Sequence, residues 1–218
     1  MTCIIGYLDR KTNDIFMGSD SAGVDAYFMQ KRLDEKVFIK DGMIFGFCGS
    51  FRMGQILRYS FKIPEKEKSM DDYEYLCGIF IDSLIECFKD KGFAVINNNE
   101  VTTEGSFLVG FNGSLYQIGN DFQVAKHMYD FDSVGSAGTI ALGALSILEK
   151  LDIEPEIKVF TALYSTLNFS CQVSAPFNVL KLSSDKKAYV IKDPFLVSGL
   201  NPSRTNNKLD SKLGKRTH

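Results

Sequence analysis

The chain has 218 residues, of which 44% are hydrophobic and 24% charged, and its formal net charge is −2. This length and composition are typical of one globular domain with a buried core and exclude a mainly disordered chain. The balanced charge gives no electrostatic footprint for nucleic acid, and no apolar run is long enough to span a bilayer. We therefore expect neither a nucleic-acid partner nor a membrane partner.

The cysteine content and the start of the sequence indicate a cytoplasmic protein. Five cysteines are scattered along the chain without a CxxC pair, which favours reduced, mostly buried thiols over zinc ligands or disulfides. The first residues lack the basic region, apolar stretch and cleavage site of a secretory signal. We expect a cytoplasmic location, no metal and no cofactor.

The first half of the chain is predicted to form two hairpins and then two helices. Short apolar runs predict four strands, at residues 3–8, 15–18, 36–39 and 43–47. Asp41-Gly42 lies between the last two, and this dipeptide is typical of tight hairpin turns. Apolar residues at helical spacing predict helices at 51–61 and 69–92, the second with Ser69 as its N-cap and Gly92 at its end. The polar residues 94–104 indicate a loop.

The second half repeats this alternation of strand pairs and helix pairs. Strands are predicted at 107–111, 115–118, 179–182 and 188–191, and helices at 140–151 and 155–167. Asn112-Gly113 is a strong hairpin signal, and Pro155 suits a first helical position. This order favours an α+β fold with antiparallel sheets covered by helices over a parallel doubly wound sheet.

The chain is predicted to be one domain over residues 1–198 with a basic tail over 199–218. The tail carries five Lys or Arg residues against one Asp, so its charge is +4 and that of the remaining chain is −6. A polar, charged segment of this kind is expected to be disordered.

The residues favour nucleophilic chemistry that does not depend on histidine. The chain has only His127 and His218, and it lacks the GxSxG, HExxH and GxxxxGK[ST] motifs. A hydroxyl can instead use the α-amine of its own residue as base when that residue is N-terminal, because the unperturbed amine has a pKa of about 7.7–8.0. Thr2 meets this condition once Met1 is removed, and a strand that begins at once would hold it rigidly.

Several segments occur in an order that resembles the proteasome β-subunit and HslV family of N-terminal-nucleophile hydrolases. They are TCIIGYLDRKTNDIFMGSDSAG, DEKVF, MIFGFCGS, EGSFLVGFNGSLYQIG, DSVGSAGTIALGAL and ALYSTLNFS, which span most of residues 2 to 182. The chain resembles still more closely the proteasome-like proteins of some phages and bacteria. This resemblance implies a four-layer αββα sandwich of two mainly antiparallel sheets flanked by helices.

Carried over position by position, the resemblance implies a set of site residues. Thr2 matches the nucleophile, Asp20 the aspartate after the second strand, and Lys36 the lysine that opens the third. Gly49 matches the glycine whose N–H helps form the oxyanion hole, and Ser136 the serine close to the terminal amine. Each residue alone has an ordinary explanation as a turn, a solvated charge or a cap, so the prediction depends on their joint occurrence.

Two further pairs of residues are candidates of lower rank. Asn168 and Ser170 stand where the family pattern has an aspartate followed by a nearby serine, so a negative charge that would orient the serine is missing. Phe47 and Phe51 flank Gly49 and are either walls of a substrate pocket or core residues. Both interpretations stay open.

The function predicted is that of a threonine endopeptidase acting on peptides or unfolded proteins. The resemblance implies a homo-oligomeric ring and allows an ATP-dependent unfoldase as partner. Two alternatives stay open: a ring-forming scaffold or binding protein without activity, and an amidase or acylase of the same fold that acts on a small amide.

Overall fold

The computed structural model describes residues 2–25, 27–97 and 100–197. The predicted tail at 199–218 lies outside the described residues, so its boundary and its disorder stay predictions. No helix in the described part of the chain is both long and apolar enough to cross a membrane.

Two five-stranded sheets form the centre of the molecule, and every strand pair in the described residues is antiparallel. The first sheet has the order β12 (Phe131–Val134), β1 (Ile4–Asp9), β2 (Asp14–Ser19), β13 (Asn178–Leu182), β14 (Ala188–Ile191). The second has the order β11 (Val124–Ala125), β10 (Ser114–Ile118), β9 (Gly105–Phe111), β6 (Met43–Gly49), β5 (Val37–Lys40). The strand that follows Thr2 is thus an interior strand, paired on both sides.

Turn dipeptides fix the register of the predicted hairpins. Asp41 and Gly42 have φ values of 47° and 75°, and Asn112 and Gly113 have 45° and 69°. Two consecutive residues with positive φ form the tight turns whose twist matches that of paired strands, and Asn, Asp and Gly tolerate this conformation best. The strands on either side therefore pair as the sequence predicts.

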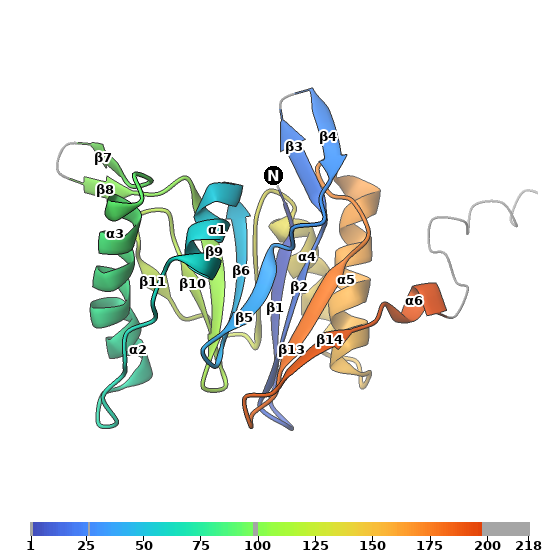
Figure 1. The fold of residues 1–218 in the computed structure, drawn as a ribbon. Helices are drawn as coiled ribbons and strands as arrows, with labels where there is room; N and C mark the ends of the chain where they lie inside the picture. The colour runs from blue at the N-terminus through green and yellow to red at the C-terminus, as the bar shows by residue number, and fades with distance from the viewer. Residues whose placement is uncertain (1, 26, 98–99, 198–218) are drawn as a thin grey trace, which may run out of the picture.

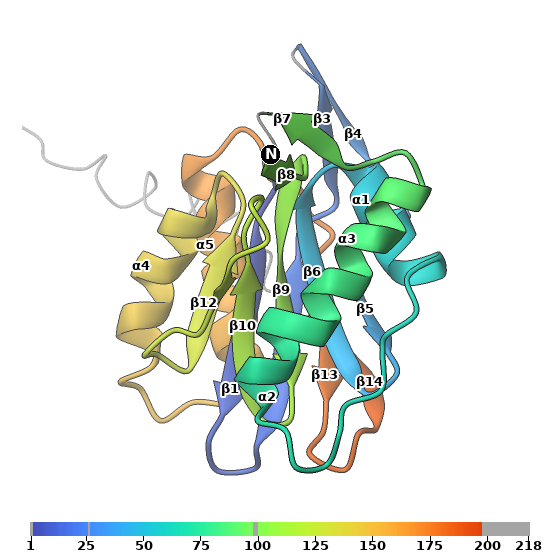
Figure 2. The ribbon, with the colours of Figure 1, turned by 90° about the vertical axis from the view of Figure 1, so that its left-hand side faces the viewer.

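Helices cover the outer sides of both sheets, as Figures 1 and 2 show. On the side of the second sheet lie α1 (Phe51–Tyr59), α2 (Asp72–Tyr75), the π-helical turn η1 (Leu76–Phe80) and α3 (Ile81–Asp90). On the side of the first sheet lie α4 (Gly138–Leu148) and α5 (Pro155–Phe169), and the short α6 (Pro194–Val197) follows β14.

Three apolar clusters join these elements. One packs the second sheet against α1 and α3, and another packs the first sheet against α4 and α5. The third lies between the sheets, where Ile4 and Met17 of the first sheet meet Ile44 and Leu108 of the second. Burial of this apolar surface holds the two sheets at a fixed distance, and the contacts between the sheets described below depend on that distance.

The predicted α+β class with antiparallel sheets and covering helices is confirmed, and several local predictions are wrong. The segment predicted as a loop at 94–104 contains the strands β7 (Val95–Asn97) and β8 (Glu100–Thr102). The N-cap of the helical segment is Asp71, whose carboxylate accepts from the backbone N–H groups of Tyr73 and Glu74, and not Ser69. Cys77 and Cys171 are exposed: Cys77 lies in η1, where only Leu76 and Phe80 are buried, and Cys171 lies in the turn that follows α5.

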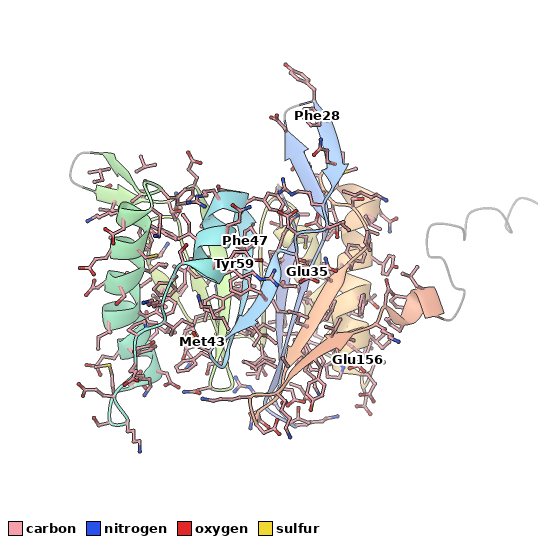
Figure 3. All side chains as sticks on the ribbon, in the orientation of Figure 1. Phe28, Glu35, Met43, Phe47, Tyr59 and Glu156 are labelled. Carbon is pink, nitrogen blue, oxygen red and sulfur yellow. The ribbon has the colours of Figure 1, made fainter. Side chains whose placement is uncertain are left out.

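A hairpin that the sequence does not predict extends beyond the sheets. It consists of β3 (Ala22–Asp25) and β4 (Phe28–Lys31), and it projects at the same end of the sheets as the start of β1 (Figure 1). All four residues of β4 are exposed, so the strand has no alternation of buried and solvated positions. Phe28 lies near its tip (Figure 3).

Candidate active site

Lys36 joins the two sheets at the end where β1 begins. It directly precedes β5 of the second sheet, and its Nζ donates to Thr2 Oγ1 at 2.8 Å and to Asp20 Oδ1 at 2.7 Å. Thr2 and Asp20 come together because Ile4 pairs with Ser19 in the first sheet, so the residues just before β1 and just after β2 are neighbours. Three of the predicted site residues are therefore in direct contact.

The Asp20 carboxylate is held in place by backbone donors. Its Oδ1 accepts from the N–H of Cys3 at 3.1 Å, and its Oδ2 accepts from the N–H of Ala22 at 2.8 Å. The Asp20 N–H donates in turn to the Cys3 carbonyl at 3.3 Å. A carboxylate fixed at both oxygens gives Lys36 a single position opposite Thr2.

Burial defines the electrostatics of this ion pair. The side chains of Lys36 and Asp20 are 2% and 0% exposed. Burial lowers the pKa of Lys36 below its ordinary value, and the attraction of Asp20 opposes this effect. Burial also raises the pKa of the neighbouring Cys3 thiol to about 12, so this thiol stays protonated at neutral pH.

The turn between β12 and α4 holds the backbone of Thr2. The Thr2 nitrogen donates to Ser136 Oγ at 3.4 Å, and the Thr2 carbonyl accepts from the Ala137 N–H at 3.3 Å. Gly135 has a φ of 104°, and a Cβ at this position would lie 2.2 Å from the Thr2 carbonyl oxygen. Only glycine allows the turn to approach Thr2 this closely.

We expect Gly135→Ala to displace Thr2 and to abolish any reaction that depends on it. The new methyl group meets backbone and the φ is unfavourable for alanine, so the free energy of unfolding should fall by roughly 1–3 kcal/mol. The control is Gly143→Ala in α4, where a Cβ meets nothing within 4 Å, and which should be neutral or slightly stabilising. Thermal unfolding of both variants measures the difference; equal stability would contradict this role of Gly135.

Gly49 and Phe51 line a pocket at this end of the molecule. Gly49 ends β6 with a φ of 93°, and a Cβ there would lie 2.4 Å from the carbonyl oxygen of Glu104. The pocket has a volume of about 280 Å³ and lies between these residues and the β3–β4 hairpin. The Phe51 ring centroid is 5.8 Å from Lys36 Nζ, so the pocket adjoins the Thr2 contact.

The structure separates the roles of the two candidate pocket residues. Phe47 is a buried core residue, and its ring occupies the space that a Cβ on Gly54 of α1 would fill. Figure 3 shows it beside this helix. Phe51 packs edge-on against Phe47 at 5.9 Å between ring centroids and lines the pocket itself. Phe47 therefore does not line this pocket but packs behind its Phe51 wall.

Asn168 and Ser170 lie outside the contacts around the ion pair. Asn168 is exposed near the end of α5, and Ser170 is the C-cap of this helix. The Ser170 Oγ accepts from the Gln172 N–H at 3.2 Å, and the hydrogen bonds of Asp20 and Lys36 involve neither residue.

Sequence reasoning missed residues that the hairpin and turn bring to the site. Arg32, directly after β4, lines the pocket, and Gly135 and Ala137 contact the Thr2 carbonyl. The one signal in the sequence was the short apolar run at residues 26–29, between Asp25 and Gln30, which fits part of a short strand. Among residues 2–25, 27–97 and 100–197, no group of three or more His, Cys, Asp or Glu could hold a metal ion.

Comparison with known proteins places the fold. No family model matches the sequence, and no curated protein matches it significantly. Solved structures match it over most of its length. Thiobacillus denitrificans BPH, solved in complex with epoxomicin, has a TM-score of 0.69 at 15% identity, over 84% of this chain and 98% of that one.

Two further structures support the same assignment. HslV from Trypanosoma brucei has a TM-score of 0.60 at 19% identity, over 84% of this chain and 99% of that one. The Anbu Gly-1 mutant from Hyphomicrobium sp. strain MC1 has a TM-score of 0.64 at 15% identity, over 100% of both chains. The chain has the proteasome-type N-terminal-nucleophile fold, which confirms the predicted resemblance at the level of the fold.

Proposed function

We propose that the chain is a threonine endopeptidase of the proteasome and HslV kind, with Thr2 as nucleophile after removal of Met1. The observation that carries this proposal is the 2.8 Å contact between Thr2 Oγ1 and the Nζ of Lys36, itself paired with buried Asp20. Burial of the charged Lys36 costs free energy, and a threonine hydroxyl with a purely structural role could be satisfied by a neutral hydrogen-bond donor instead.

The chemistry proceeds through an acyl-enzyme. The α-amine of Thr2 takes the proton of Oγ1 as this oxygen attacks the carbonyl carbon of a peptide bond. The C–N bond then breaks, and the departing amine takes that proton, which leaves an ester on Thr2. Water attacks the ester with the α-amine again as base, the carboxylic acid product leaves, and the hydroxyl of Thr2 is restored.

Lys36 and Gly49 supply the electrostatic stabilisation of this reaction. The charged Nζ of Lys36 favours the alkoxide that develops at Oγ1, and it acts strongly because it is removed from water. Gly49 lies at the exposed end of β6 beside the pocket, where its N–H can donate to the oxyanion of the tetrahedral intermediate. Ser136 contacts the nitrogen that serves as base.

We expect a bell-shaped dependence of kcat/KM on pH. The rate should rise as the Thr2 α-amine loses its proton near its ordinary pKa of about 7.7–8.0, because only the neutral amine can act as base. It should fall again as Lys36 loses its charge. Because burial lowers the pKa of Lys36, this alkaline limb should lie below the ordinary lysine value of 10.5. In the double variant Lys36→Ala/Asp20→Asn the alkaline limb should disappear; a limb that persists would assign it to another group.

Self-assembly into a homo-oligomeric ring is part of the proposal. It is supported by apolar side chains that remain exposed in the single chain, among them Tyr27, Leu33 and Phe169. Folded substrates would require an ATP-dependent unfoldase as partner, whereas unstructured peptides would not. Light scattering at micromolar concentration measures the assembly, and a stable monomer would contradict it.

We also propose that the architecture is the full four-layer αββα sandwich, supported by the three apolar clusters.

Peptide turnover by a chain of known mass tests the function. Intact mass establishes whether Met1 has been removed, and an unstructured peptide and a small amide are then offered in parallel. Cleavage of the peptide that is lost in Thr2→Ala supports the proposal. Cleavage of the small amide alone would favour the amidase, and turnover of neither by the processed chain would favour the scaffold.

A further inference from the structure

The pocket beside Gly49 contains one cation close to the nucleophile. The guanidinium carbon of Arg32 lies 3.8 Å from the ring centroid of Phe51, and the same ring lies 5.8 Å from Lys36 Nζ. Lys36 Nζ in turn contacts Thr2 Oγ1 at 2.8 Å. A side chain next to a scissile bond held at Thr2 would therefore meet Arg32 on the wall of this pocket.

Arg32 is held in one conformation before any ligand arrives. Its side-chain Nε and Nη2 donate to the two carboxylate oxygens of Asp34 at 2.7 and 2.5 Å. Its backbone N–H donates to the Ser21 carbonyl at 2.8 Å. Gly23 makes room for the stem, since a Cβ there would lie 2.5 Å from Arg32 Cδ. Stacking on Phe51 fixes the plane of the guanidinium. Such preorganisation reduces the entropy lost on binding.

The pair with Asp34 leaves a nitrogen of Arg32 for a ligand. Asp34 uses Nε and Nη2, and Nη1 takes no part in that pair. Asp34 is not among the residues that line the pocket, whereas Arg32 is. The other charged residue of the lining is Asp25, which pairs with Phe28 toward the tip of the hairpin. The pocket wall therefore carries the guanidinium of Arg32, paired with Asp34, at the end near Gly49 and the carboxylate of Asp25 at its outer end.

We propose that Arg32 is a specificity-determining residue that selects substrates with a carboxylate side chain immediately before the scissile bond. The proposal rests on the proposed peptidase function. A carboxylate at this place accepts a charge-assisted hydrogen bond from Nη1, and an amide of the same shape accepts only a weaker one. A basic side chain would meet Arg32 with like charge.

A pair of isosteric substrates tests this selectivity. Short peptides that carry Glu or Gln immediately before a fluorogenic amide differ only in charge, and the ratio of their kcat/KM values is independent of how much active enzyme is present. We expect the wild type to prefer Glu by about fivefold, a value reduced for the partial exposure of Arg32. Added salt should lower the ratio.

Three variants assign the preference. In Arg32→Met the ratio should fall to about one, and in Asp34→Asn it should rise, because the guanidinium loses its internal partner. Arg58→Met is the matched control: Arg58 is 34% exposed where Arg32 is 35%, and it pairs with Glu35. It lines a neighbouring cavity on the other side of Phe51 and Asp34, not this pocket, so it tests whether any nearby arginine has the same effect. It should keep the fivefold preference. A ratio near one in the wild type, or a preference that survives Arg32→Met, would overturn the proposal.

Binding to an inactive variant separates this proposal from the peptidase function. Fluorescence anisotropy of the same peptides, labelled, with the Thr2→Ala protein measures selection without cleavage. A fivefold tighter Kd for the Glu peptide that disappears in Thr2→Ala/Arg32→Met supports the role of Arg32 even if the wild type hydrolyses nothing. Equal affinities for the Glu and Gln peptides would overturn it even if the wild type is an active peptidase.

Discussion

Lys36→Ala is expected to lower kcat/KM for peptides by about 10²-fold. This is the effect of removing a donor that stabilises developing negative charge, roughly 3 kcal/mol of transition-state stabilisation. The physical reason is the position of Nζ, 2.8 Å from Thr2 Oγ1 in a site that excludes water. Steady-state kinetics on unstructured peptides measures the loss.

A control is needed because the same variant leaves the buried Asp20 without its cation. Removing one partner of a buried ion pair usually destabilises a protein strongly. The double variant Lys36→Ala/Asp20→Asn removes the unpaired charge, and an Asn side chain can still accept a backbone hydrogen bond such as that from Cys3. We expect it to assemble and to show the same loss of about 10²-fold in kcat/KM, which leaves a residual rate whose pH dependence can be measured. Near-normal, Thr2-dependent turnover by assembled Lys36→Ala would contradict the mechanism.

Asp20→Ala should have the largest effect on folding. It leaves the N–H groups of Cys3 and Ala22 without their acceptor, and it removes the counter-ion of the buried Lys36, whose Nζ keeps only its hydrogen bond to Thr2 Oγ1. We expect a loss of about 3–5 kcal/mol in the free energy of unfolding, which corresponds to roughly 10 °C in Tm for a chain of this size. Urea denaturation and thermal unfolding both measure it.

The pH dependence of this loss tests its cause. Without Asp20 the pKa of Lys36 in the folded state falls further below the ordinary value of 10.5, so the unfolded state binds more protons. Stability therefore rises with pH, and the destabilisation by Asp20→Ala should be smaller at pH 10 than at pH 7. Asp14→Ala, at the opposite end of β2 from Asp20, is the control: its partner Lys181 is partly exposed, and about 1 kcal/mol is expected. Equal losses for both variants at all pH values would argue against a desolvated Lys36.

The parts of the fold that sequence predicts are those fixed by local conformation and one-sided burial. Asp41-Gly42 and Asn112-Gly113 predict their hairpins because few other residues adopt two successive positive φ values. Pro155 marks the start of α5 for a similarly local reason. The β3–β4 hairpin carries no such signal, since β4 is exposed on both faces.

In the candidate site too, the sequence could predict some residues, whereas others depend on tertiary contacts. Asp20 and Lys36 could be named because their types and order resemble a known pattern, but residue type alone does not show that both are buried or that they meet. Arg32 was missed because one arginine near a polar stretch looks like any solvated charge, and its place on the pocket wall depends on the hairpin. Asn168 lies one residue before the end of α5 and is exposed. The match of residue types to the family pattern does not show whether a side chain is buried or exposed.

The most direct test of the central claim is the mass of the chain during turnover of a peptide. Protein from its natural host, quenched with acid while it cleaves a short peptide, should lack Met1 and carry the acyl part of that peptide as an ester on Thr2. The adduct should be absent from Thr2→Ala and should disappear when the peptide is exhausted. A chain that keeps Met1, or a processed chain that forms no adduct and cleaves no peptide, would contradict the account.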